Sequence, residues 1–255
     1  MARETKKETS GLRKALRQVV LIVCGVAVLT GISVSMVHRY LIHDPKFILS
    51  HDRRDALTIS GLRYGSRAKV QRIFAEDADR SVFSVPLEER RRRLLAIDWV
   101  EDAAVSRVWP DRLAVRILER KPVAFVQVQS AVMLIDGEGW LLEPPPRAQF
   151  TFPVLSGVRA EDPPARRMEA VRALLDVEDS LGAGMKDVSE VNATDPGNIR
   201  IVAQVEGHVV DLILGEDNLG PRYRNFLDHY AEMRKRSPEV RMFDLRLDDR
   251  ITAKE

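Results

Sequence analysis

Cysteine is almost absent from this chain of 255 residues, which contains only Cys24. One thiol can form neither an internal disulfide nor a zinc site built from cysteines. Histidine is scarce too, and its five positions show no HExxH or other ligand spacing: they are His38, His43, His51, His208 and His229. The sequence therefore predicts no metal site.

Signatures of catalysis are also missing. No Gly-x-Ser-x-Gly elbow occurs, and Cys24 lies inside an apolar run where it cannot serve as an exported nucleophile. Gly137-x-Gly139 invites a phosphate-loop interpretation, but Leu142 stands where a dinucleotide fingerprint has its third glycine. We therefore expect no enzymatic activity, no catalytic residue, no cofactor and no small-molecule substrate.

A large net charge is the third absence. Lys and Arg number 40 and Asp and Glu 38, which leaves a formal charge of +2. A surface that must attract nucleic-acid phosphates needs a strong positive excess, so we expect no nucleic-acid partner. With 45% hydrophobic and 31% charged residues, the composition is that of a folded protein.

One long apolar run is present near the N-terminus. Residues 19–37 read VVLIVCGVAVLTGISVSMV, without charge, histidine or proline. Nineteen residues at about 1.5 Å each give roughly 28 Å of helix, close to the ~30 Å hydrocarbon core of a bilayer. The run predicts a transmembrane helix. A buried helix of a soluble protein and a cleavable signal peptide, with Ser33-Val34-Ser35 as the cleavage site, are the alternatives.

Flanking charges predict the orientation of this helix. Residues 1–18 carry six basic and two acidic side chains, whereas the charges after the helix are mixed. By the positive-inside rule, residues 1–18 form a cytoplasmic tail and residues 38–255 lie outside the cytoplasm, as in a single-pass type II protein of the inner (plasma) membrane. Small side chains recur every four residues at Ala27, Gly31 and Ser35, which would let another transmembrane helix approach closely.

The first exported module is expected to be a small α+β domain over residues 38–121, with its core at about 46–121. Two extended segments, 46–50 and 57–61, precede helices over about 66–75 and from Pro86 onward, and strands on either side of Pro110-Asp111 complete the order strand-helix-helix-strand-strand. The arginine run 90–93 is either a patch for lipid phosphates or nucleic acid, or the solvated face of a helix, and we favour the solvated face.

Residues 122–255 predict a second module, mainly antiparallel β with flanking helices. A hairpin over 132–142 is followed by a helix at 163–181 and by strands at 188–192, 199–205 and 209–214. The next helix, 219–236, has the clearest periodicity, with six apolar side chains expected on its buried side: Leu219, Tyr223, Phe226, Leu227, Tyr230 and Met233. Residues 239–251 then predict one half-buried strand, in which Phe243, Leu245, Leu247 and Ile251 share a face.

Several of these segments resemble the bacterial cell-division family FtsQ/DivIB. The run WVEDAAVSRVWPDRLAVRILERKPVAF at 99–125 is similar to the stretch with which that family closes its polypeptide-transport-associated (POTRA) domain. Leu214-Gly215 followed by Arg222, Phe226 and Tyr230 resembles a second family stretch, with Tyr223 in place of the usual Leu. The end of the chain resembles the family's terminal DLRY strand, with Leu247 in place of Tyr.

The resemblance implies a divisome scaffold at the division septum, in which the domain at 122–255 binds FtsB, and with it FtsL, and links early division proteins to the septal peptidoglycan synthase. Strand addition to a free sheet edge is one mode by which a terminal strand binds. The residues carried over to this role are Phe243, Arg246, Leu247, Asp248 and Arg250. Arg246 either pairs with a carboxylate of the partner or only neutralises Asp244 or Asp248 nearby.

Two other functions stay open at this stage. One is a membrane-anchored cell-wall accessory enzyme, and the other is a POTRA-bearing transport component. The second would need a downstream barrel of many alternating strands, for which residues 122–255 are too few and too often interrupted by helices.

Overall fold

The structure is a computed structural model that describes residues 5–50, 53, 55–146 and 148–254. Helix α1 (Thr5–His43) contains the apolar run, and a membrane-spanning candidate extends over Arg17–His43, whose most apolar stretch has a mean hydropathy of 2.5. Positions 1–4 of the expected cytoplasmic tail, and the side chains of 5–16, lie outside the described part. The exposed apolar side chains of α1 are what a helix surrounded by lipid requires.

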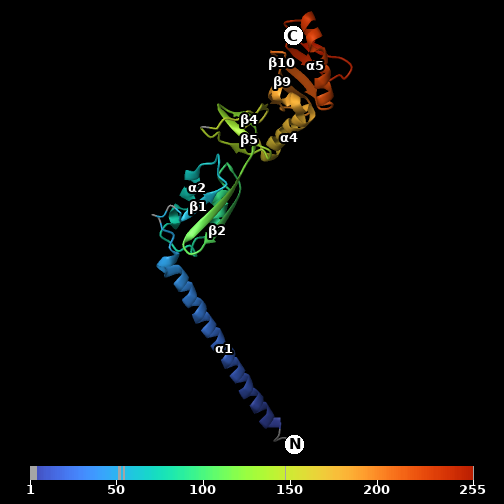
Figure 1. Cartoon of the computed structure of the whole chain (residues 1–255). Helices are drawn as coiled ribbons and strands as arrows, with labels where there is room; N and C mark the ends of the chain where they lie inside the picture. The colour runs from blue at the N-terminus through green and yellow to red at the C-terminus, as the bar shows by residue number, and fades with distance from the viewer. Residues whose placement is uncertain (1–4, 51–52, 54, 147, 255) are drawn as a thin grey trace. The chain divides into compact units, whose positions relative to one another are not determined.

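The segment that follows α1 has the expected order of strand, two helices and two strands (Figure 1). Its elements are β1 (Leu57–Ser60), α2 (Arg67–Ile73), α3 (Leu87–Leu94), β2 (Val100–Val108) and β3 (Arg112–Glu119). Among the described residues, they form a three-stranded sheet in the order β1-β3-β2, with β1 parallel to β3. Every second residue of β3 is buried, at Leu113, Val115 and Ile117, as the period of a strand with one covered face demands.

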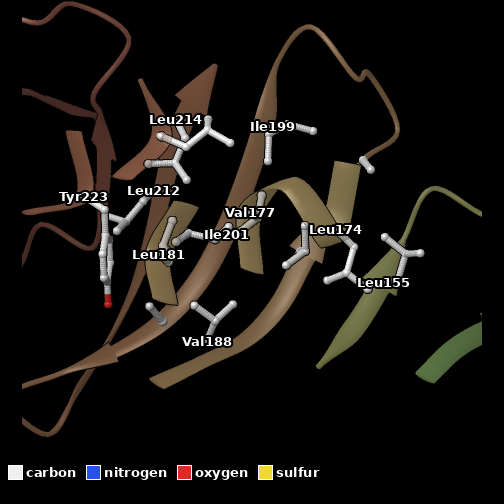
Figure 2. Packing of buried hydrophobic residues seen from close by; sticks show 14 of the residues in the cluster. Leu155, Leu174, Val177, Leu181, Val188, Ile199, Ile201, Leu212, Leu214 and Tyr223 are labelled. Carbon is white, nitrogen blue, oxygen red and sulfur yellow. The ribbon is translucent and has the colours of Figure 1, made fainter. Parts of the chain in front are cut away.

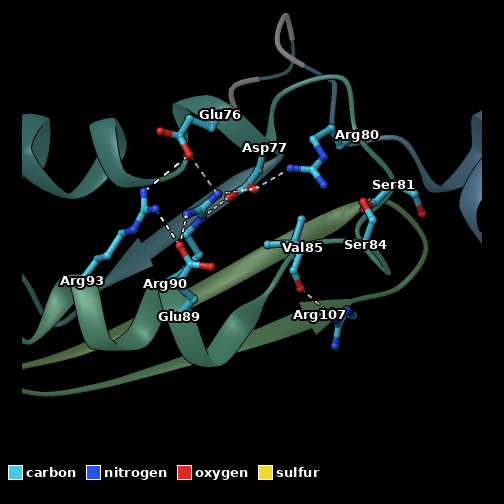
Figure 3. Close-up of polar contacts among 10 residues, drawn as sticks. All are labelled: Glu76, Asp77, Arg80, Ser81, Ser84, Val85, Glu89, Arg90, Arg93 and Arg107. Atoms are coloured by element: carbon cyan, nitrogen blue, oxygen red, sulfur yellow. Dashed lines mark hydrogen bonds and ion pairs between the residues drawn. The ribbon is translucent and has the colours of Figure 1, made fainter.

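Two sequence-based expectations for this segment are wrong. Residues 46–50 are not extended throughout, because Pro45–Phe47 forms the short 3-10 helix η1, capped by the Asp44 carboxylate, which accepts from the Lys46 N–H at 2.9 Å. The arginine run is not a uniformly solvated face either. The Arg90 side chain is buried and meets the buried Asp77 carboxylate through two hydrogen bonds of 2.7 and 2.9 Å (Figure 3). Asp77 ends the short 3-10 helix η2 (Ala75–Asp77), thirteen residues earlier in the chain.

The second sheet has nine strands among the described residues, in the order β12-β11-β10-β9-β8-β7-β4-β5-β6. Its strands in chain order are β4 (Pro122–Val128), β5 (Ala131–Asp136), β6 (Leu141–Leu142), β7 (Val154–Ser156), β8 (Val188–Asn192), β9 (Ile199–Val205), β10 (His208–Gly215), β11 (Met242–Asp244) and β12 (Thr252–Lys254). The helices are α4 (Pro164–Leu181), which continues into the 3-10 helix η3 (Gly182–Asp187), and α5 (Leu219–Arg236). Pairing is antiparallel in β8-β9-β10 and parallel where a helix intervenes, as between β10 and β11.

A continuous apolar core lies between this sheet and helices α4 and α5 (Figure 2). Leu174 and Val177 from α4 pack with strand residues such as Ile201 and Leu212, and all four are at most 1% exposed. Burial of a side chain of this size contributes about 1.5–3 kcal/mol. Leu227 is the exception in α5: it lies at the flank, 39% exposed, because its position falls at the edge of the stripe that Phe226 and Tyr230 bury.

Contacts divide the chain into two compact units, and each unit is made of several separate stretches of sequence. Residues 62–66 and 95–102 belong to the unit that contains 118–255, although they lie within the first module in sequence. Within that unit the Trp99 indole N–H donates to the carbonyl of Glu143 at 2.8 Å, and the Glu119 carboxylate accepts from the backbone N–H groups of Tyr64 and Gly65. These bonds attach both short segments to the second unit.

Candidate functional site at the C-terminal end of the sheet

The last strand differs from its expected form. Instead of one strand over 239–251, the chain makes the short β11, turns over residues 245–251 and returns as β12, antiparallel to β11. β11 is therefore enclosed between β10 and β12, and the strand at this edge of the sheet is β12. The alternation of apolar and polar residues that predicted one strand continues through residues 245–251, but these residues form a turn and belong to no strand of the sheet.

Hydrogen bonding identifies which backbone groups face the edge. Asp211 N–H donates to the Arg241 carbonyl at 2.8 Å and Leu245 N–H to the Ile213 carbonyl at 2.9 Å, so odd-numbered residues of β11 face β10. Met242 and Asp244 then face β12 and pair with Lys254 and Thr252. Because neighbouring residues of a strand direct their N–H and C=O to opposite sides, Ala253 directs both groups away from β11, toward the edge.

Leu247 lies in the turn between β11 and β12 and is 50% exposed. On one side, the Arg246 guanidinium donates to the Asp244 carboxylate at 2.7 and 2.9 Å. On the other side, Arg222 of α5 donates to the Asp248 carboxylate at 2.7 Å and to the Leu214 carbonyl at 2.7 Å. Both neighbours of Leu247 are thus fastened to the body of the domain, and the leucine points an apolar side chain toward solvent.

The charges around the turn are paired within the chain. The Arg246 hydrogen bond holds the pKa of the Asp244 carboxyl well below its usual range, and Lys254, whose Nζ lies 3.0 Å from Asp244, lowers it further. The bond to Asp244 in turn raises the pKa of Arg246. Arg246 therefore neutralises Asp244, which was one of the two interpretations left open, yet its guanidinium uses only part of its five donors and its side chain is 48% exposed.

Gly215 makes this arrangement possible. Its φ is +82°, and a Cβ at this position would lie 3.1 Å from Cγ of Arg246 and 3.2 Å from Nη1 of Arg222. Glycine alone combines the left-handed backbone with the space that both arginines occupy. Sequence reasoning assigned no role to Gly215 or Arg222, although both belong to the LG…R stretch on which the family resemblance rests.

The remaining predicted residues have different positions. Phe243 is 3% exposed and packs on Phe226 and Tyr230 with ring centroids 5.1 and 6.3 Å away, so it supports the turn from inside. Arg250 is exposed, and with Asp249 and Ile251 it lines a groove of about 290 Å³ whose other wall is α5. The groove adjoins the turn that carries Leu247.

The small residues predicted for packing between transmembrane helices are exposed. Ala27, Gly31 and Ser35 lie on the exposed α1, and nothing stands within 4 Å of a Cβ placed on Gly31. Within the described ranges, no three or more His, Cys, Asp or Glu side chains are grouped so that they could hold a metal ion.

Comparison with known proteins decides the family. Residues 55–120 match the family model "POTRA domain, FtsQ-type", and residues 124–246 match "Cell division protein FtsQ/DivIB, C-terminal". The cell division protein FtsQ of Koribacter versatilis is 33% identical over 240 residues, which cover 92% of this chain and 69% of that protein. The chain belongs to the FtsQ/DivIB family. The resemblance noted in the sequence is thereby confirmed, together with the α+β class and the POTRA domain.

A second FtsQ protein agrees with this assignment. FtsQ of Novosphingobium aromaticivorans is 30% identical over 231 residues, 89% of this chain and 68% of that protein. The solved extracytoplasmic domain of DivIB from Geobacillus stearothermophilus is 18% identical, covers 47% of this chain and 95% of that chain, and has a TM-score of 0.27, too low to bear on the fold. Membership makes this a bacterial cell-division protein, and its N-terminal apolar helix fits a single-pass membrane protein.

Proposed function

We propose that the chain is a divisome scaffold that works by binding and not by catalysis. Its N-terminus lies in the cytoplasm, α1 crosses the inner membrane once, and the two exported domains act outside the cytoplasm at the division septum. The domain beginning at residue 122 binds FtsB, and with it FtsL, and so links early division proteins to the septal peptidoglycan synthase. Family membership supports the cell-division role, and the site at the end of the sheet supports the binding mode.

The presentation of Leu247 carries the proposal. An exposed leucine on a mobile loop would lose conformational entropy when a partner covers it, but the two ion pairs beside Leu247 restrict its backbone before binding. Burying the exposed half of a leucine contributes about 1 kcal/mol, or about fivefold in Kd. Replacing it by glutamate costs more, because the partner would have to desolvate a carboxylate.

The edge of β12 supplies the second part of the interface. Because Ala253 directs its N–H and C=O outward, a partner strand can pair there. An edge of three described residues offers few main-chain bonds, so side-chain contacts at Leu247 and along the groove beside α5 must supply most of the affinity.

Leu247→Glu tests the apolar contact. We expect this variant to lose co-purification with FtsB and FtsL, while Val132→Glu, a matched change on β5 at a side chain 59% exposed, retains it. Both variants should fold as the wild type does, since both side chains are largely in solvent. Equal recovery of FtsB with Leu247→Glu and wild type would contradict the proposed site.

Ala253→Pro tests strand pairing separately. Proline removes the outward N–H without removing a bond between β11 and β12, because the residues that face β11 are Thr252 and Lys254. We expect weaker FtsB binding for Ala253→Pro than for Ala253→Gly, which keeps the N–H. Equal affinities would leave the site at Leu247 but would exclude strand addition at β12.

A further inference from the structure

Trp109 is an exposed aromatic side chain that the binding site at the other end of the chain does not use. It lies between β2 and β3 and is 68% exposed, next to Val108, which is 36% exposed. Its ring is nevertheless held in place, with its centroid 5.0 Å from that of Phe47 and 6.3 Å from that of Phe83. An exposed tryptophan that is fixed on a buried phenylalanine presents a defined apolar surface.

The same phenylalanine connects Trp109 to the end of α1. The Phe47 ring packs edge-to-face on Tyr40, with centroids 5.7 Å apart, and the Ser81 hydroxyl donates to the Leu41 carbonyl at 2.6 Å. Given the two ring separations, the indole of Trp109 lies at most about 11 Å from the Tyr40 ring. Tyr40 follows Val37, the last residue of the apolar run, by three residues, or about 4.5 Å of helix.

These upper limits leave Trp109 close enough to the end of the apolar run to reach the membrane surface. The headgroup region adds about 5–7 Å on each side of the hydrocarbon core, and tryptophan and tyrosine concentrate there because their rings are apolar and their N–H and O–H groups are polar. Arg107, two residues before Trp109, is exposed and donates to the carbonyls of Val82, Phe83 and Val85, as Figure 3 shows for Val85. Because backbone carbonyls carry no net charge, these bonds do not neutralise the guanidinium, and its positive charge attracts lipid phosphates.

We propose that the turn between β2 and β3 docks on the lipid surface from which α1 emerges, with the Trp109 indole inserted among the headgroups of that leaflet. The proposal rests on α1 as a membrane span, which is part of the proposed function. It adds a second membrane contact, through the POTRA domain, to the single helix.

Quenching of tryptophan emission by brominated lipid tests this contact. The full chain is reconstituted into nanodiscs of phosphatidylglycerol and phosphatidylcholine, with or without bromine on the acyl chains, in the absence of any other protein. Of the three tryptophans, Trp99 is buried, whereas Trp140 is 50% exposed and serves as the matched control. We expect bromine to quench the wild type and Trp140→Phe, and the quenching to be lost in Trp109→Phe.

The outcomes separate the two hypotheses. Quenching that persists in Trp109→Phe, or quenching absent from the wild type, would overturn the docking and leave the exposed ring for a protein partner. Failure of the wild-type chain to float with lipid vesicles would overturn the span of α1 itself, and the docking with it. If Trp109→Phe does not fold, Trp140→Phe still tests the contact, because it retains Trp109. Loss of quenching in Trp140→Phe would refute the contact of Trp109 with lipid.

Discussion

The buried pair of Arg90 and Asp77 yields a sharp prediction about the POTRA domain. Arg90 is 2% exposed and Asp77 0%, and two parallel hydrogen bonds of 2.7 and 2.9 Å join them. The bond to Asp77 raises the pKa of Arg90. Removal of the arginine leaves a carboxylate in the interior, paired among the described residues only with Arg80 at 4.0 Å.

We expect Arg90→Met to destabilise this domain by about 3–5 kcal/mol, the usual cost of an unpaired buried charge. Asp77→Asn should cost less, because Arg90 keeps Glu76 and Glu89, each 3.4 Å away, as partially solvated partners. The double variant Asp77→Leu/Arg90→Met removes both charges and should recover most of the stability, since a buried ion pair repays little more than its own desolvation.

Hydrogen exchange of the full chain in detergent micelles measures these differences locally. A loss of 3 kcal/mol accelerates exchange of β1 and β3 by about 100-fold, while β9 and β10 of the other unit serve as an internal control. Less than tenfold acceleration for Arg90→Met, or a double variant as unstable as the single one, would refute the argument.

Three further predictions concern the second domain. Gly215→Ala should destabilise the chain by about 1–2 kcal/mol and lower its melting temperature, because φ is positive and Arg246 lies 3.1 Å from the new Cβ. Gly137→Ala, with nothing within 4 Å of the new Cβ, should leave the melting temperature unchanged. The pKa of Asp244 is lowered in the folded chain, so the ionised carboxylate stabilises the fold at neutral pH, and this contribution is lost as pH falls below about 4. In thermal melts, Asp244→Asn should therefore destabilise the chain at pH 6 and less so at pH 3. The Tyr230 hydroxyl is buried without a hydrogen-bond partner among the described residues, so Tyr230→Phe should leave the free energy of unfolding unchanged or raise it by up to about 1 kcal/mol in thermal melts, and a clear loss would reveal a missed partner.

The sequence alone determined the features that depend on local pattern. The apolar run at 19–37 is contained in α1, the predicted strands at 188–192 and 199–205 coincide with β8 and β9, and the helix at 219–236 is α5. Each is a continuous segment whose period or hydropathy is set by its own residues. The family motifs near Trp109 and Gly215 were readable for the same reason, because they are contiguous.

Contacts between residues that are distant in the chain could not be predicted from local pattern. Arg90 in an exposed-looking run is buried because Asp77 faces it from a separate turn of helix, and Leu247 is exposed because Arg222 and Asp244 fasten its neighbours. Alternation predicted that Leu247 shares the buried face of Phe243, but the chain reverses after β11, and alternation persists in a sequence whether or not a sheet continues. The hydrophobic period of a segment can be recognised in its own residues, but the partner of a side chain that is distant in sequence cannot.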